Sequence, residues 1–229
     1  KYRTGFDRNF WIWDEFDPAC NYLMVADVAR GDGADYSTFH IIKLETLEIV
    51  GEYQGKATLD MFANMLNQVG REYGNCMLVV ENNNIGYSVL DKLLEYGYPN
   101  LYHSIKSTHE YIEQHQAEYR NSAVPGFTTT TKTRPLIIAK LEEFIRNKLI
   151  TVYSSRTINE RKTFIWRNGK PQAMKGYHDD LIMALAIACW IRDTALQNSS
   201  RDLNYQKAFL GAIYTSKTTM NSQIKHKKY

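Results

Sequence analysis

Two short apolar runs in this chain each lead directly into a carboxylate, and this pattern limits the possible folds more than any other feature. Tyr22–Ala26 is followed by Asp27, and Cys76–Val80 is followed by Glu81. An apolar run of about five residues is typical of a buried strand. An ionised carboxylate at the end of such a strand is costly to bury unless a cation or several donors compensate it. A single Asp at the end of a strand is more often part of a turn. The turn interpretation is weakened here because the same pattern, an apolar run followed by a carboxylate, occurs twice.

A third acidic site lies far downstream. His178, Asp179 and Asp180 lead into eleven apolar residues, Leu181–Ile191, which are predicted to form a helix. A helix dipole favours ionised acids at this position, although a simple N-cap explains one Asp better than a pair. Only Arg30 lies close enough in sequence to neutralise any of the three sites. A divalent cation shared by all three sites would explain their placement.

Three motifs together resemble the nuclease domain of the large terminase subunit of tailed bacteriophages, with the T-even type most similar. The motifs are Asp27-Val28-Ala29-Arg30-Gly31 with Asp35 beyond it, Val79-Val80-Glu81-Asn82, and His178-Asp179-Asp180-Leu181. They occur in the family's order, and the resemblance covers residues from about 20 to about 195. It implies an α/β protein with a ribonuclease H-like mixed β-sheet flanked by helices. It also implies an endonuclease that cuts concatemeric double-stranded viral DNA during headful genome packaging.

The order of the expected elements agrees with this fold. The predicted strands are Tyr22–Ala26, Tyr36–Leu44, Leu47–Tyr53, Cys76–Val80 and Leu101–Ile105, with helices over 59–72 and around Val89–Leu94. A further short strand is predicted downstream over Leu149–Tyr153. The helix over 59–72 is long enough to form a crossover, so the fourth strand can run parallel to an earlier one. In the ribonuclease H-like layout the first and fourth strands are neighbours, which would bring Asp27 and Glu81 together.

The resemblance also implies a set of site residues and two bound ions, Mg²⁺ or Mn²⁺. The expected metal ligands and catalytic residues are Asp27, Glu81, Asp179 and Asp180. Asp27 is expected to bridge both ions, and the choice between Asp179 and Asp180 stays open. Asp35 and His178 are assigned supporting roles, Asp35 in fixing the turn. Arg30 departs from the acidic residue expected in the most similar relatives, so no direct metal role is assigned to it.

Two basic segments are candidates for contact with DNA. Thr133 and Pro135 mark the start of a helix, and Asn168-Gly169 between strand-like residues predicts an added β-hairpin. The predicted DNA-binding residues are Lys132, Arg134, Arg167, Lys170 and Lys175. A helix start beside basic residues suits a phosphate group. The first segment could equally be a Thr-rich cap on a core helix, and the second a charged edge strand exposed to solvent.

Composition adds few constraints. At 229 residues with 44% hydrophobic residues, the chain can form one domain with a tail. The predicted organisation is an irregular entry segment or linker over 1–21, a nuclease domain over 22–197, and a basic, mobile C-terminal tail over 198–229. No apolar run reaches the ~18 residues of a membrane span. The three cysteines show no metal-type spacing, which favours free thiols.

Partners and alternatives complete the expectations. By resemblance, an ATPase domain would lie upstream, and the partners would be double-stranded DNA, the portal protein and the small terminase subunit, with no membrane. The expected location is the host cytoplasm, transiently at the prohead portal. One alternative function is that of a Holliday-junction resolvase-like or transposase-like nuclease, because these enzymes have the same fold and also carry scattered carboxylates. A second alternative is a non-catalytic module that docks to DNA or to the portal. A sugar-kinase-like phosphotransferase fits the sequence less well than either, because the Gly-rich phosphate loops of that class are missing from it.

Overall fold

The computed structural model describes residues 1–30, 33, 35–83, 85–105 and 123–192. The chain divides into two units, Lys1–Arg192 and Asp193–Tyr229, and the described residues all belong to the first. The predicted boundary at 197/198 and the predicted tail over 198–229 therefore lie outside the described residues. Within the described part of the chain, no helix has the length and apolar character needed to cross a membrane.

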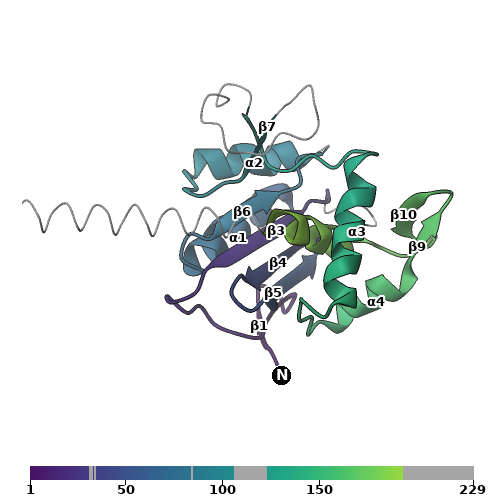
Figure 1. Ribbon diagram of the computed structural model, residues 1–229. Helices are drawn as coiled ribbons and strands as arrows, with labels where there is room; N and C mark the ends of the chain where they lie inside the picture. The colour runs from purple at the N-terminus through teal and green to yellow at the C-terminus, as the bar shows by residue number, and fades with distance from the viewer. Residues whose placement is uncertain (31–32, 34, 84, 106–122, 193–229) are drawn as a thin grey trace, which may run out of the picture. The chain divides into compact units, whose positions relative to one another are not determined.

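A six-stranded mixed sheet forms the centre of the described unit, with the strand order β1-β2-β5-β4-β3-β6 (Figure 1). Its strands are β1 (Arg3–Gly5), β2 (Phe10–Ile12), β3 (Tyr22–Asp27), β4 (Ser37–Lys43), β5 (Glu48–Gly55) and β6 (Met77–Val80). The β3–β6 pair is parallel and the other neighbours are antiparallel. A parallel pair needs a crossover connection, and α1 (Leu59–Glu72) lies in the segment that joins β5 to β6. The α/β fold with a ribonuclease H-like mixed sheet, predicted from the sequence, is confirmed.

The two faces of the sheet are covered by different helices. Side chains alternate between the two faces of β3, and Met24 lies on the face covered by α1 and α2 (Gly86–Glu95). There it belongs to one hydrophobic core with Phe62 of α1 and Leu90 of α2. The opposite face of β3 and β4 is covered by a helix over residues 180–192, which crosses in front of these strands in Figure 1. This helix is almost completely buried from 181 to 189, as its continuous apolar sequence predicts. Arg192 is the last described residue, so the structure gives no C-terminal limit for it.

The segment over 1–21 differs from the irregular structure expected for it. It contributes β1 and β2 to the edge of the sheet beside β5. Phe10 and Ile12 are buried while Trp11 between them is half-buried, and the Phe10 ring packs edge-on against Phe39 with centroids 5.2 Å apart. Each strand has only three residues, too few for the alternation to be recognised in the sequence.

Three local elements also differ from expectation. The strand predicted over Leu101–Ile105 joins the main sheet only through a bridge at Leu101, and β7 (His103–Ile105) pairs instead with β8 (Ala123–Pro125). The strand predicted over Leu149–Tyr153 is a single bridge at Thr151. The polar helix α4 (Ser155–Thr163) was not predicted, because it lacks an apolar period.

The predicted β-hairpin is present as β9 (Phe164–Arg167) and β10 (Lys170–Ala173). Asn168 and Gly169 both have positive φ angles, 51° and 74°, as a two-residue hairpin turn of this type requires. The hairpin follows α4 directly and lies beside α3 (Thr133–Arg146), the helix predicted to begin near Thr133 (Figure 1).

A buried polar network attaches α4 to the sheet. The carboxylate of Glu52 on β5 is fully buried and accepts hydrogen bonds from Ser154 Oγ, Thr157 Oγ1 and Arg156 Nε. Ser154 is also the N-cap of α4, accepting from the backbone N–H groups of Arg156 and Thr157. A buried charge is tolerated when it is paired and hydrogen-bonded in this way. The network therefore fixes the position of a helix that has little apolar surface of its own.

We expect Glu52→Gln to lower the free energy of unfolding by about 3 kcal/mol, because removing one partner of a buried ion pair leaves the other uncompensated. Urea denaturation monitored by circular dichroism measures this change. Glu15→Gln is the matched control, since Glu15 pairs with Arg3 on the exposed surface, where such pairs contribute below about 1 kcal/mol. Equal effects of the two substitutions would contradict the assigned role of Glu52.

Candidate metal centre

The ends of β3 and β6 bring two carboxyl groups together. In the parallel ladder Ala26 is opposite Val80, so Asp27, the last residue of β3, and Glu81, the first residue after β6, lie side by side. The backbone N–H of Glu81 donates to Ala26 O at 2.9 Å, and the proximity of the Glu81 carboxyl group helps to raise the pKa of Asp27. The predicted adjacency of the first and fourth strands is confirmed.

Asp180 reaches the same edge of the sheet from the start of the 180–192 helix. Its carboxylate accepts a hydrogen bond from Tyr36 N at 3.2 Å, and its backbone carbonyl accepts one from Thr38 Oγ1 at 3.2 Å. The next carbonyl, of Leu181, accepts from His40 Nε2 at 3.0 Å. Three consecutive contacts from the region of β4 therefore fix the first turn of this helix.

Burial and mutual repulsion perturb these acids. The pKa of Asp27 is raised well above its usual value by burial, and further by Glu81, Asp180 and Asp179. Burial raises the pKa of Asp180 to about 6, against the lowering effect of the Tyr36 N–H. Like charges at one site disfavour ionisation, and a bound cation reverses that effect. The arrangement is electrostatically unfavourable for ionised carboxylates alone and suited to a divalent cation.

Asp179 has a different environment from Asp180. Its carboxylate pairs with Arg134 Nη2 at 2.5 Å and accepts a hydrogen bond from Ala173 N at 3.2 Å. Arg134 Nε in turn donates to Pro171 O at 3.0 Å. Arg134, which was predicted to contact DNA, therefore connects α3 to β10 and to Asp179 in this structure.

Asp35 and His178 lie next to Asp180. His178 Nδ1 is 3.6 Å from Asp35 Oδ1 and 3.8 Å from Asp180 Oδ2. One ligand atom from each of the three residues lies within 4.8 Å of the others, so together they could hold a metal ion. A pocket of about 340 Å³ opens beside them, and Asp27, Asp35 and Asp180 all line it. The structure thus groups the two residues predicted to be supporting with two of the four predicted ligands.

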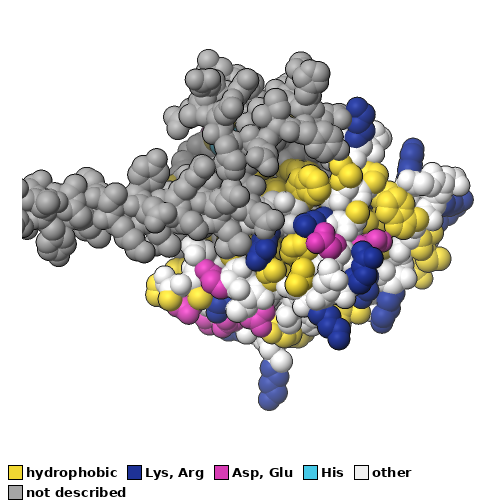
Figure 2. Space-filling view, in the orientation of Figure 1, with side chains coloured by type: hydrophobic (Ala, Val, Ile, Leu, Met, Phe, Trp, Pro, Cys, Tyr) yellow, Lys and Arg dark blue, Asp and Glu magenta, His cyan; other side chains and the backbone are white. Residues whose placement is uncertain are grey.

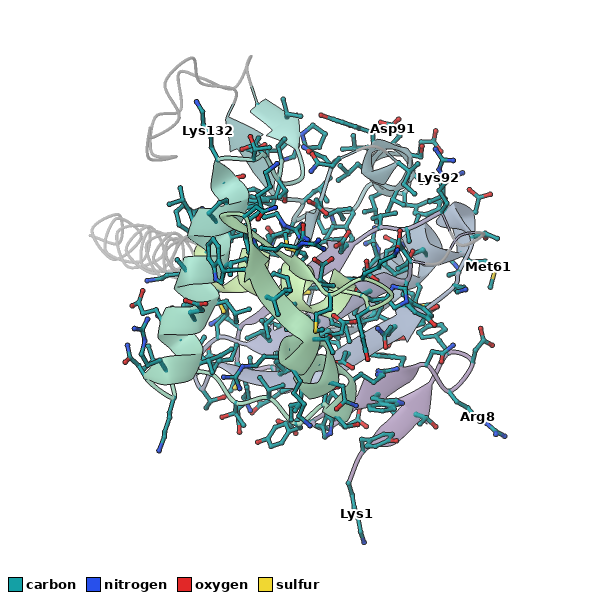
Figure 3. The ribbon with its side chains drawn as sticks, turned by 90° about the vertical axis from the view of Figure 1, so that its right-hand side faces the viewer. Lys1, Arg8, Met61, Asp91, Lys92 and Lys132 are labelled. Carbon is teal, nitrogen blue, oxygen red and sulfur yellow. The ribbon has the colours of Figure 1, made fainter. Side chains whose placement is uncertain are left out.

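The remaining predicted DNA-binding residues lie on exposed surface. Lys132 is at the N-terminal end of α3, where its side chain points away from the body of the molecule (Figure 3). Arg167 and Lys170 flank the hairpin turn, and Lys175 follows the hairpin. Their contact with DNA stays a prediction.

Sequence reasoning missed one buried acid that contacts the site. Glu160 on α4 accepts hydrogen bonds from Leu181 N at 2.9 Å and Ile182 N at 3.2 Å, both on Oε2. Its Oε1 accepts from Gln54 Nε2 at 2.8 Å. The pKa of Glu160 is raised to about 8, mainly by burial and in part by Asp180 and Asp179, against the lowering effect of the two backbone N–H groups. Glu160 thus accepts hydrogen bonds from the first free N–H groups of a helix that begins 20 residues later in the chain. No local sequence motif indicates such a contact.

No protein-family model matches the chain. Among solved structures, the large terminase nuclease of the thermophilic phage G20c with bound magnesium is similar, with a TM-score of 0.63 and 17% identity over 82% of this chain and 89% of that one. The large terminase nuclease domain of Thermus phage P74-26 has a TM-score of 0.59 and 19% identity over 79% of this chain and 84% of that one. At these identities the likeness establishes a shared fold. The T-even subtype suggested by the sequence is not confirmed, since these neighbours come from thermophilic phages.

We expect the metal-free protein to lose stability as pH rises from about 6.5 to about 8. Over this range the unfolded chain has already released the Glu160 proton, whereas the folded protein, with a pKa of about 8, still retains it. The folded state then binds more protons, so its free energy of unfolding falls with rising pH. Thermal unfolding in EDTA measures the effect.

Glu160→Gln should make this pH dependence shallower, because the amide cannot ionise. Burial lowers the pKa of His40, so His40 makes stability rise with pH, but only below about pH 6.5. It therefore does not affect the slope between about pH 6.5 and about pH 8. Identical slopes for the parent protein and Glu160→Gln would show that Glu160 is already ionised in the folded state.

Proposed function

We propose that this chain is a metal-dependent endonuclease domain that cuts double-stranded DNA during packaging of a viral genome. The observation that carries the proposal is the convergence of Asp27, Glu81 and Asp180 at one edge of the sheet, with pKa values of Asp27 and Asp180 that burial raises. The fold shared with large terminase nuclease domains, one of them solved with bound magnesium, supports it.

The donor set fits Mg²⁺ or Mn²⁺, which prefer carboxylate oxygens. Asp27 would be the ligand shared by the two ions, because it lies beside Glu81 at the ends of β3 and β6 and lines the same pocket as Asp180. Asp35 and His178 would add ligands on the Asp180 side. Two ions held by these residues would supply Lewis-acid chemistry, activating a water molecule and stabilising the leaving oxygen of a phosphodiester. Because carboxyl groups must ionise to bind metal, loading near neutral pH would release protons.

The two acids at the helix start are proposed to divide their roles. Asp180 shares its surroundings with Asp35 and His178 and lines the pocket beside Asp27, so it is the candidate ligand. Asp179 is held by Arg134 and by the backbone of β10, so in this state it connects the hairpin to the helix start. This geometry supports Asp180 as the indispensable member of the pair.

The substrate and partners follow from the same proposal. Concatemeric viral DNA cut in a headful mechanism is the proposed substrate, with an ATPase domain, a portal protein and a small terminase subunit as partners at the prohead portal in the host cytoplasm. Lys132, Arg167, Lys170 and Lys175 lie at a helix start, a hairpin turn and a loop, positions suited to phosphates rather than base edges. Cutting should therefore show little sequence preference, and mapping the ends of the products would reveal any dominant cut sequence.

Asp27→Asn should abolish Mg²⁺- or Mn²⁺-dependent nicking of plasmid DNA. Loss of an outer contact to a metal ligand already costs about 10–100-fold, so loss of the proposed bridging ligand should exceed about 100-fold. Without metal, the melting temperature should be unchanged or higher, because one of the mutually repelling groups is removed. Gel assays and thermal unfolding in EDTA measure the two effects.

Asp91→Asn is the matched control, since Asp91 is exposed on α2 at the periphery of the molecule in Figure 3 and does not line the pocket of the carboxyl cluster. It should leave nicking unchanged. Activity retained by a well-folded Asp27→Asn protein would end the metal-site assignment. A parent protein that binds DNA without cutting it in either metal would instead favour the docking-module alternative.

A further inference from the structure

A second pocket adjoins the carboxyl cluster on the side of β5 and α4. It has a volume of about 540 Å³, within the range of sites that hold a nucleotide-sized group. Its lining includes Tyr36, Gln54, Asn159, Lys162, Tyr177 and His178. These residues come from four separate segments: the position just before β4, the end of β5, α4, and the loop before the 180–192 helix.

This pocket continues the candidate metal site along one edge of the sheet. The antiparallel pairing of β3 with β4 and of β4 with β5 places the end of β3, the start of β4 and the end of β5 at the same edge. Tyr36 and His178 stand at the boundary, with their rings edge-on at a centroid distance of 5.0 Å. His178 also lies within 4 Å of carboxylate oxygens of Asp35 and Asp180. A linear polymer held at the metal site could therefore extend directly into the second pocket.

The chemistry of the lining suits a sugar–phosphate chain. Lys162 is exposed in the last turn of α4. Lys56 is not part of the lining, but its ammonium group lies 5.4 Å from the centre of the Tyr36 ring, which does line the pocket. Tyr177 is 57% exposed, which leaves its ring available for packing. The acid in the lining, Glu160, has both carboxyl oxygens engaged by Gln54, Leu181 and Ile182. Cations and aromatic rings are the groups with which proteins hold single strands.

Figure 2 shows Lys and Arg side chains gathered on the side of the molecule where α3, α4 and the hairpin lie, with a few acidic side chains among them. Within this region, Arg156 donates to Glu52 and to the carbonyl of Asn9, so its charge is already compensated. Lys162 lines the pocket, whereas its neighbour in α4, Arg161, does not. This pair of adjacent cations offers a direct comparison.

We propose that this second pocket binds the backbone of one DNA strand beside the scissile phosphate, with Lys162 at a phosphate and Tyr177 against a sugar or base. The proposal rests on the proposed nuclease function and adds to it a part of the substrate site. It places a DNA contact on α4 and the 176–178 loop, separate from the contacts expected at Lys132 and the hairpin.

The test compares Lys162→Ala with Arg161→Ala, which remove equal charges from adjacent exposed positions of one helix. Binding of a fluorescent short duplex is measured by anisotropy in EDTA over a series of salt concentrations. Lys162→Ala should reduce the slope of log affinity against log salt by about 1, the value for one lost phosphate contact. Arg161→Ala should leave the slope unchanged, and Lys162→Arg should restore it.

Tyr177→Ala provides a second readout in the cleavage reaction. Loss of one base–aromatic contact should lower kcat/KM about ten-fold while leaving metal binding unchanged, and Tyr177→Phe should retain activity. Thermal shifts produced by Mn²⁺ report metal binding independently of DNA.

The proposal is overturned if Lys162→Ala and Arg161→Ala change the salt slope equally. Equal changes would show that DNA responds to the overall positive charge of the protein and not to a specific contact at Lys162. The proposal is also overturned if neither variant changes the slope, or if the parent protein does not bind the duplex. Failure of the nuclease proposal looks different, because the parent protein would bind DNA without cutting it in Mg²⁺ or Mn²⁺. The binding comparison uses no metal, so the two results remain separate.

Discussion

The parallel pairing of β3 with β6 is the interaction on which the candidate site depends. It sets Ala26 opposite Val80 and so places Asp27 and Glu81 side by side where the two strands end. Side chains alternate between the faces of a strand, so a shift of one residue in this register would turn one of the acids to the other face. The crossover containing α1 makes the parallel pair possible, and α1 and α2 then cover one face of it.

The site concentrates acidic groups that repel one another, and a separate set of polar contacts fixes the elements that carry them. Glu52 attaches α4 to β5, and Glu160 on α4 then satisfies the first N–H groups of the 180–192 helix. Contacts from Tyr36, Thr38 and His40 fix the same turn from the other side. The position of Asp180 therefore depends on hydrogen bonds from two directions as well as on the apolar burial of its helix.

Much of this arrangement could be predicted from local sequence, and the rest could not for physical reasons. Buried strands, the Asn168-Gly169 turn and the apolar helix from Leu181 leave strong periodic or turn signals, and their order indicated the neighbouring strands. The edge strands β1 and β2 are too short to show a period, and α4 is polar because Glu52 and Arg156, rather than an apolar face, hold it in place. The pairs Arg134–Asp179 and Glu160–Leu181 join residues distant in sequence, and a single sequence carries no signal for them.

The central claim is that the carboxyl cluster at this edge of the sheet binds divalent cations. Calorimetric titration of Mn²⁺ into the protein near neutral pH, in two buffers with different enthalpies of ionisation, tests it most directly. The raised pKa values of Asp27 and Asp180 mean that binding should release protons, so the observed heat should depend on the buffer, and Asp180→Asn should weaken binding strongly. Absence of Mn²⁺ binding to the parent protein, or equal binding by Asp180→Asn, would contradict the account.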